Sequence, residues 1–258
     1  MAASGSPLAG VRVLVPRPPH QASALSDRIR AAGGQPVEAA TIRTVPGDAE
    51  QLAVAVSDLA GGRFAAVCLT SANGVAALAQ AFADADLDPV QGLARCGWVG
   101  AVGARTAGTA ADRLGVAPDV VPARSTAADL GAAVPEGSGR VLLPRGDLAR
   151  AELEEALASA GYTPHPVVAY RTIAADALPA AVVDDLTSGA IHLVAATAGS
   201  AVRGLVALLG DRPLAARLVS IGPVTTAVCD ELGVAVVAEA DPHDLDGLLA
   251  ALARASTA

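Results

Sequence analysis

Four short motifs of hydroxyl, amide and glycine residues carry the groups in this sequence that are best suited to hold a small anion. Each motif follows a short apolar run, the pattern of a buried strand that leads into a helix. Free N–H groups at the start of a helix bind anions, but Ser, Thr and Asn are also the preferred helix caps. The motifs therefore predict either ligand contacts or helix caps alone. Their candidate binding residues are Thr70, Ser71, Asn73, Gly103, Thr106, Thr197, Ser200, Gly222 and Thr225.

Two arginines, Arg17 and Arg145, each follow a proline at the end of a predicted strand. The planar guanidinium group of arginine matches a carboxylate, so we expect both residues to bind an anionic substrate. A surface ion pair is the alternative for each. Arg43, Arg150 and Arg171 are further candidates with the same two interpretations.

The composition argues against several classes of protein. The net charge is −8 and the chain has one Trp, two Tyr and two Phe, so we expect no nucleic-acid surface. The three cysteines and four histidines are scattered, which predicts no metal site. The glycine motifs match neither G-x-G-x-x-G nor Walker A, so no nucleotide site is predicted. No export signal or membrane span is recognisable, which predicts a cytoplasmic protein without membrane contact.

The sequence contains an internal repeat. RVLVPR at residues 12–17 matches RVLLPR at residues 140–145. In the same order, TSANGV at 70–75 matches TAGSAV at 197–202, and GART at 103–106 matches GPVT at 222–225. Similar segments in a constant order indicate a duplicated architecture. Because both halves carry the motifs at the same point, ligand contact is favoured over capping alone.

Short apolar β-branched runs alternate with alanine- and leucine-rich segments in both halves. This alternation predicts an α/β fold with parallel sheets that are covered on both faces. Helices are expected over residues 71–82, 199–209 and 223–232. Ligands of such sheets bind beyond the carboxyl ends of the strands, where the motifs fall. We interpret strands over 36–44 and 164–172 as a connection between two lobes, with ordinary edge strands as the alternative.

The ordered motifs resemble those of uroporphyrinogen-III synthases along nearly the whole chain. The matching segments are VLVPRP, TSANGV, VGARTA, RVLLPRGDLAR, VVAYRT and SIGPVTTA. The resemblance implies two pseudo-duplicated lobes of Rossmann-like or flavodoxin-like type, joined by a two-stranded β-ladder. It places residues 1–38 and 174–258 in one lobe and 43–168 in the other, with 39–42 and 169–173 as the linker. The sequence departs from the family pattern at Ala198, where serine is common, and at Thr226, where alanine is common.

The resemblance also implies a reaction. The substrate would be hydroxymethylbilane, a linear tetrapyrrole with eight carboxylates. A lyase of this family closes it into uroporphyrinogen III with loss of water and inversion of ring D. No cofactor is expected, because the pyrrole nitrogens supply the electrons. Tyr170, at the family's tyrosine position, is the expected proton donor or leaving-group binder, with Tyr162 as the lesser candidate.

The implied partner is this small molecule, with neither nucleic acid nor membrane. We expect a monomer that makes transient contact with the preceding enzyme of the pathway. The alternative hypothesis is a non-enzymatic two-lobed sensor that binds a small anion or a tetrapyrrole. Such a sensor explains the repeat and the helix starts, but it predicts an export signal or an output domain, and neither is recognisable in the sequence.

Overall fold

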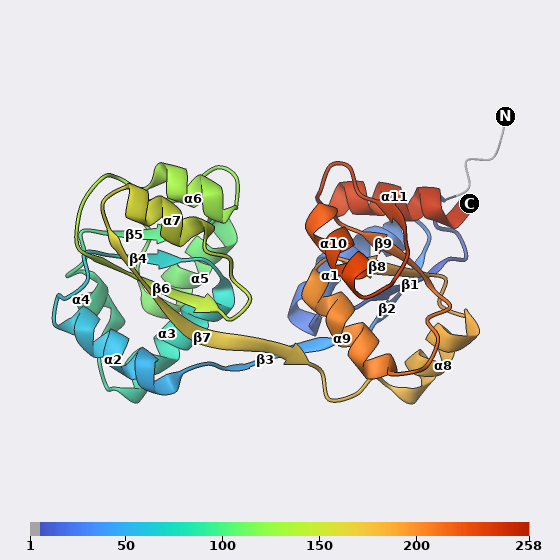
Figure 1. The fold of residues 1–258 in the computed structure, drawn as a ribbon, viewed down its shortest axis with the longest axis horizontal. Coiled ribbons are helices and arrows are strands. Elements are labelled where there is room, and N and C mark those ends of the chain that lie inside the picture. The colour runs from blue at the N-terminus through green and yellow to red at the C-terminus, as the bar shows by residue number, and fades with distance from the viewer. Residues whose placement is uncertain (1–5, 258) are drawn as a thin grey trace. The chain divides into compact units, whose positions relative to one another are not determined.

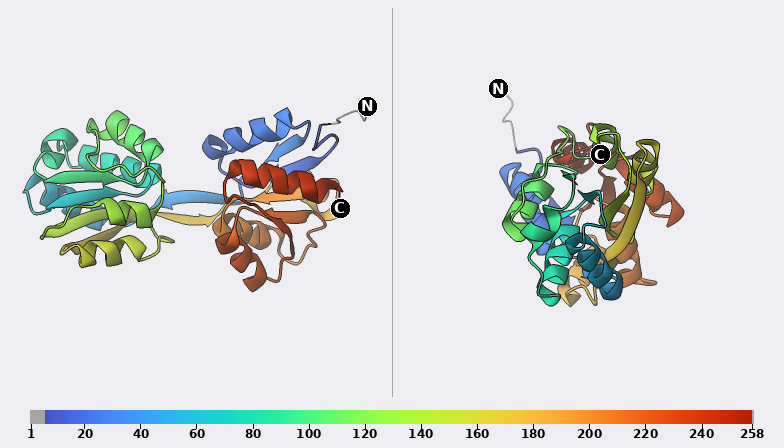
Figure 2. Two further views of the ribbon diagram at one scale, coloured as in Figure 1. Left: turned by 90° about the horizontal axis from the view of Figure 1, so that it is seen from above. Right: turned by 90° about the vertical axis from the view of Figure 1, so that its left-hand side faces the viewer.

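A computed structural model describes residues 6–257 of the chain. The chain forms two compact units: unit 1 (Met1–Arg43 and Ile173–Ala258) and unit 2 (Thr44–Thr172). Each unit has one five-stranded sheet with helices on both faces (Figure 1 and Figure 2). The predicted α/β fold is therefore confirmed. Among the described residues, no helix is both long enough and apolar enough to cross a membrane.

Unit 1 has the strand order β10-β9-β8-β1-β2, and its strands are parallel. Its strands are β1 (Arg12–Val15), β2 (Gln35–Glu38), β8 (Leu193–Ala196), β9 (Arg217–Ser220) and β10 (Val236–Glu239). Its helices are α1 (Pro19–Ala31), α8 (Ala180–Ser188), α9 (Gly199–Leu209), α10 (Pro223–Glu231) and α11 (Leu245–Thr257). One core includes Leu25 of α1 and Leu252 of α11, and a second includes Leu186 of α8 and Leu205 of α9. The strands between these two cores are buried on both faces, which explains their continuous apolar sequence.

Unit 2 has the strand order β3-β7-β6-β4-β5. Its strands are β3 (Ile42–Pro46), β4 (Ala66–Leu69), β5 (Trp98–Ala101), β6 (Arg140–Gly146) and β7 (Thr163–Ala174). Its helices are α2 (Ala49–Ala60), α3 (Ala72–Asp84), α4 (Pro89–Leu93), α5 (Ala104–Leu114), α6 (Ala127–Ala133) and α7 (Glu152–Ser159). One core includes Leu59 of α2 and Phe82 of α3, and a second includes Leu130 of α6 and Leu157 of α7.

Strands β3 and β7 form the ladder in which the chain passes between the units. The Gly47 N–H donates to the Ala169 carbonyl at 3.1 Å, and the Ala175 N–H donates to the Thr41 carbonyl at 3.0 Å. This pairing is antiparallel, whereas β4, β5, β6 and β7 are parallel. A β-carbon at Gly47 would lie 1.9 Å from the Val168 carbonyl oxygen, so glycine is required at this end of the ladder.

Two details of the predicted elements are corrected by the structure. The single strand predicted over 36–44 is two strands, β2 and β3, which belong to different sheets. Thr41 separates them, and its buried hydroxyl donates to the Ala201 carbonyl at 2.7 Å. Helices α2 and α8 were not predicted, because their alanine- and valine-rich sequences follow polar, proline-bearing segments that resemble loops.

A matching ion pair joins the two halves of the sequence inside each unit. In unit 1, Arg12 at the start of β1 binds Asp185 of α8 with an N···O distance of 2.6 Å. In unit 2, Arg140 at the start of β6 binds Asp58 of α2 at 2.8 Å. Arg12 and Arg140 are equivalent in the repeat. Each unit therefore combines segments of both halves through the same contact.

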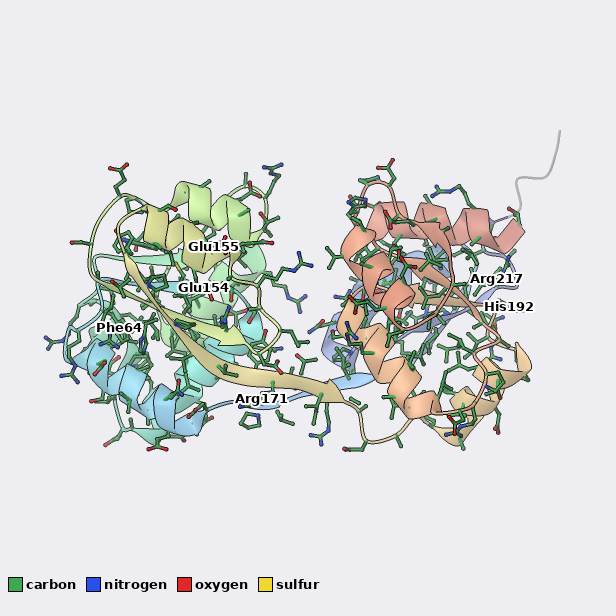
Figure 3. The ribbon with its side chains drawn as sticks, viewed as in Figure 1. Phe64, Glu154, Glu155, Arg171, His192 and Arg217 are labelled. Atoms are coloured by element: carbon green, nitrogen blue, oxygen red, sulfur yellow. The ribbon has the colours of Figure 1, made fainter. Side chains whose placement is uncertain are left out.

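Two groups beside Arg140, Asp58 and His165, have lowered pKa values. The Arg140 guanidinium lies 4.4 Å from the ring centre of Phe64, which Figure 3 labels, and 3.3 Å from Nε2 of His165. The hydrogen bond from Arg140 lowers the pKa of Asp58, and Arg63 adds to this effect. Burial, followed by the charge of Arg140, lowers the pKa of His165. This cluster lies at the amino ends of the strands, away from the predicted binding motifs.

The cysteines are free thiols with raised pKa values. Burial raises the pKa of Cys68 to about 12 and that of Cys96 to about 11, and it also raises the pKa of Cys229. All three therefore remain protonated at neutral pH, and none has the thiolate character of a nucleophile.

Candidate active site

The two binding motifs of unit 2 lie side by side at the carboxyl ends of β4 and β5. The Val102 N–H donates to the Leu69 carbonyl at 2.9 Å, which brings the start of α3 next to the start of α5. Ser71 caps α3, because its Oγ accepts from the Gly74 N–H at 3.0 Å. A β-carbon at Gly74 would lie 2.5 Å from the Pro144 carbonyl oxygen, so the glycine lets α3 pack closely on β6.

Unit 1 repeats this arrangement at the carboxyl ends of β8 and β9. The Ile221 N–H donates to the Ala196 carbonyl at 2.9 Å, the equivalent of the Val102–Leu69 bond. Helix α9 has Ala198 at its N-cap and no side-chain cap. The departure from the family pattern at Ala198 therefore leaves the first amides of α9 without the hydroxyl that Ser71 supplies to α3.

Most of the predicted polar side chains are not used as caps. Within residues 6–257, Ser71 is the only one of them whose side chain forms a hydrogen bond. The other members of the set are Thr70, Asn73, Thr106, Thr197, Ser200 and Thr225, and their side chains have no such partner in that part of the chain. Thr106 and Thr225 are nevertheless buried, with exposed fractions of 6% and 4%. These hydroxyl and amide groups are therefore available to a ligand.

Thr226 behaves differently from its neighbour Thr225. Its hydroxyl lies 2.6 Å from Oγ of Ser220, donates to the Glu239 carboxylate and is 3.3 Å from the Gly222 carbonyl. The departure from the family pattern at Thr226 thus links the ends of β9 and β10 and the start of α10.

Gly103 and Gly222 permit close packing at the starts of α5 and α10. Their backbones are extended, and neither helix has a side-chain cap. A β-carbon would lie 2.0 Å from Oγ of Ser125 at Gly103, and 3.1 Å from Cγ of His243 at Gly222. Ser125 and His243 were not predicted as neighbours of the motifs. They occupy corresponding loops that lead into α6 and α11, and the repeat could have indicated them.

Tyr170 lies near the end of β7, opposite Gly146 of β6. Its side chain is half-buried and packs against the core of unit 2. The ring covers Gly146, where a β-carbon would be 2.8 Å from Cζ of the phenol. Within residues 6–257 the Tyr170 hydroxyl has no hydrogen-bond partner. In the part of the chain that is described, the Tyr170 hydroxyl is therefore available to a ligand.

Tyr162 has a structural role. It is 8% exposed, and its hydroxyl oxygen accepts from Nε1 of Trp98 at 3.0 Å. The two rings meet edge to face, with centres 5.8 Å apart. The two tyrosines therefore differ, because the Tyr162 hydroxyl is hydrogen-bonded inside the core and the Tyr170 hydroxyl is not hydrogen-bonded within residues 6–257.

A cavity of about 470 Å³ lies beside Tyr170 in unit 2. Residues of α2, α3 and β3 line it, most of them apolar, and Asn73 and Tyr170 are both part of its wall. Among the described residues, the only charged side chain in the lining is Asp84, whose carboxylate accepts from Gln80 at 2.8 Å. The cavity suits an apolar ring face rather than a carboxylate.

Arg145 is engaged within unit 2. Its Nη1 contacts the carbonyls of Ala149 and Arg150 at 3.3 Å and the Glu154 carboxylate at 2.5 Å, and Figure 3 labels Glu154. Its Nε is buried without a hydrogen-bond partner in the described residues. Arg145 therefore orders the loop that follows β6.

The other candidate arginines differ in their contacts. Arg17 lies 3.5 Å from Oε1 of Gln21. Arg43 binds Asp176 at 3.0 Å, and Arg150 lies 3.6 Å from Glu152. Arg171, labelled on β7 in Figure 3, is exposed.

The repeated units define a duplicated, open-sheet α/β protein whose strand-end motifs carry polar groups without a partner in the described residues. The family model described as uroporphyrinogen-III synthase HemD matches residues 23–250. The chain belongs to the uroporphyrinogen-III synthase family, whose members are cyclising lyases.

Individual uroporphyrinogen-III synthases are also similar to this chain. The uroporphyrinogen-III synthase of Synechococcus elongatus is 29% identical over 267 residues, which cover 95% of this chain and 96% of that protein. A crystal structure of a mutant uroporphyrinogen III synthase from the extremely thermophilic bacterium Thermus thermophilus has a TM-score of 0.63 at 24% identity, covering 96% of this chain and 99% of that one. The uroporphyrinogen-III synthetase of Helicobacter pylori has a TM-score of 0.58 at 15% identity, covering 93% and 96%. The two structural likenesses support the fold.

Proposed function

We propose that this chain converts hydroxymethylbilane into uroporphyrinogen III, with loss of water and inversion of ring D. The observation that carries the proposal is the family match over residues 23–250, which includes both sets of strand-end motifs. The unused polar side chains in those motifs support it, because a substrate with eight carboxylates needs many donors.

Helix starts in each unit offer donors for substrate carboxylates. The first N–H groups of α5 and α10 have no side-chain cap, and Thr106 and Thr225 lie in those first turns. Backbone amides and helix dipoles attract anions without adding formal positive charge. This compensates for the net charge of −8, which would otherwise repel the substrate.

Tyr170 assists departure of the substrate hydroxyl. The phenol donates its proton to the leaving oxygen, which departs as water, while a pyrrole nitrogen supplies the electron pair and an azafulvene cation forms. The substituted carbon of ring D attacks this cation, and the resulting spiro intermediate fragments and closes with ring D inverted. The proton released at closure restores the phenol. The cavity beside Tyr170 suits the face of a pyrrole ring, because its wall is largely apolar.

The experiment that tests this function is an isomer assay. The purified chain is added to hydroxymethylbilane that is generated in situ, and the oxidised products are separated into uroporphyrins I and III. Predominant isomer III supports the synthase, and isomer I alone, the product of spontaneous closure, rejects it in favour of a binding protein without chemistry.

The proposal also includes a monomer that acts in the cytoplasm and makes transient contact with the enzyme that supplies its substrate. Light scattering during size-exclusion chromatography tests the monomer.

A further inference from the structure

Helix α5 of unit 2 begins with an arginine that has no acidic partner among the described residues. Arg105 is the second residue of α5 and is exposed. Within residues 6–257 its guanidinium forms neither a hydrogen bond nor an ion pair, and the first turn of α5 has no acidic residue. A cation at this end of a helix is unfavourable, because it faces the positive pole of the helix dipole. The position of Arg105 therefore carries an electrostatic cost that the described part of the unit does not offset.

The acidic side chains in the segment beside α5 are engaged elsewhere. That segment contacts the start of α5 where Ser125 packs on Gly103. Asp129 binds Arg124 at 2.7 Å, and its carboxylate also accepts from the Thr126 hydroxyl. Asp119 accepts from the Val99 N–H at 2.8 Å. A ligand could supply the missing negative charge.

Thr106 is a second, independent indication of a ligand. It is only 6% exposed, yet its hydroxyl lacks a hydrogen-bond partner in residues 6–257. The hydroxyl oxygen is not among the fully buried side-chain atoms of the described residues that lack a partner, so a ligand can reach it. The N-cap of α5 is Gly103, which has no side chain to accept from the first amides. One helical turn thus combines a cation, a hydroxyl and uncapped N–H groups, which together match a carboxylate.

The equivalent turn of unit 1 lacks the cation. In the GPVT motif of α10, Val224 stands where α5 has Arg105, and Val224 is 53% exposed. Two otherwise equivalent helix starts therefore differ in charge. A carboxylate bound at a helix start therefore gains a charge interaction at α5 that it lacks at α10. This difference favours α5 as the position of one substrate carboxylate.

We propose that Arg105 is a specificity-determining residue that binds one carboxylate of the substrate at unit 2. This rests on the proposed synthase function. Arg105 and Tyr170 belong to the same unit, so a carboxylate held by Arg105 determines which end of the bilane reaches the Tyr170 hydroxyl. The reversed substrate would leave without catalysis and close spontaneously to isomer I.

The test compares Arg105→Gln with Arg105→Lys and with Arg113→Gln. Arg113 is also exposed and lies in the last turn of the same helix, so its substitution is the matched control. For R105Q we expect KM to rise about tenfold or more, since a lost charged hydrogen bond has this magnitude. We also expect a smaller change in kcat, more isomer I and a weaker dependence of KM on salt. R105K should recover part of the loss, and R113Q should resemble the wild type.

Three results would overturn this role. They are a wild-type KM and isomer ratio in R105Q, an equal rise of KM in R113Q, and a marked fall in Tm of R105Q that R105K shares. A failure of the wild type to form isomer III would instead reject the proposed function. The two failures are therefore distinguishable in one set of measurements.

Discussion

The ring of Tyr170 lies against the α-carbon of Gly146, with no space for a side chain between them. A β-carbon on Gly146 would be 2.8 Å from Cζ and 2.9 Å from the hydroxyl oxygen of the phenol. The two residues are paired across β6 and β7, next to a register shift between Arg145 and Gly146. The absence of a side chain at Gly146 therefore determines where the Tyr170 hydroxyl lies.

Gly146→Ala is expected to lower kcat about tenfold. The added methyl group displaces the Tyr170 ring, and small displacements of a catalytic group have large effects on rate. Steady-state kinetics of the single variants and of G146A/Y170F test this in a double-mutant cycle. In the Y170F background, G146A should cause no further loss of kcat. A further loss of kcat in the double variant would contradict the explanation.

Gly108→Ala is the matched control for that substitution. Gly108 lies within α5, and nothing lies within 4 Å of the position that a β-carbon would occupy. Alanine should therefore leave the rate unchanged and raise the free energy of unfolding by roughly 0.5–1 kcal/mol through helix propensity. Urea unfolding and the isomer assay measure the two effects separately.

The two tyrosines are expected to give opposite results when replaced by phenylalanine. Tyr170→Phe removes a hydroxyl without a protein partner in the described residues, so kcat should fall about 10² or more with little change in stability. Tyr162→Phe leaves the buried Nε1 of Trp98 unpaired, which should lower the free energy of unfolding by about 1–3 kcal/mol with little change in kcat. Steady-state kinetics and urea unfolding of both variants test these two expectations. Equal effects of the two variants on rate would count against Tyr170 as the donor.

Acid is expected to destabilise unit 2 through His165 and Asp58. The pKa of His165 is lowered from 6.5 by burial, so folding resists its protonation, and its contribution is lost as the pH falls from 6.5 through the lowered pKa. The pKa of Asp58 is lowered from 3.8 by the Arg140 hydrogen bond, so its contribution is complete above pH 3.8 and is lost below it.

Urea unfolding as a function of pH tests these two steps. His165→Gln should flatten the profile just below pH 6.5, and Asp58→Asn should flatten it below pH 3.8. An unchanged slope in either variant would show that other groups cause the loss of stability.

Thr226→Val should destabilise unit 1 without affecting the isomer ratio. The substitution keeps the shape of the side chain but leaves the fully buried Ser220 hydroxyl without its neighbour. We expect the free energy of unfolding to fall by about 1–2 kcal/mol. Thr187→Val is the control, because its half-buried hydroxyl only donates to the Asp184 carbonyl within a helix. That variant should change stability by less than about 0.5 kcal/mol.

Local patterns in the sequence were sufficient to predict the repeat and much of the secondary structure. Helix α9 (Gly199–Leu209) has the predicted bounds, and α10 (Pro223–Glu231) ends one residue earlier than predicted. Their boundaries are set by a turn motif before the helix and by apolar periodicity within it, and both are visible in a short window. The same local signals placed the binding motifs after strands.

Other features depended on contacts between distant segments. The sequence ranked Tyr170 above Tyr162 only through its resemblance to the family. The structure supplies a physical difference between them, which is the hydrogen bond between Tyr162 and Trp98. The sequence pattern alone also could not show that Arg145 contacts Glu154 while Arg105 lacks a partner in the described residues.

The tertiary structure also decided how the repeat is distributed between the units. Strand β1 lies beside β8, and β6 lies beside β4, so each sheet mixes strands from both halves of the sequence. Periodicity records which face of a strand or helix is apolar, and this determines that the strands are buried. It contains no information about which other segment buries them, because pairing depends on the packing of whole units.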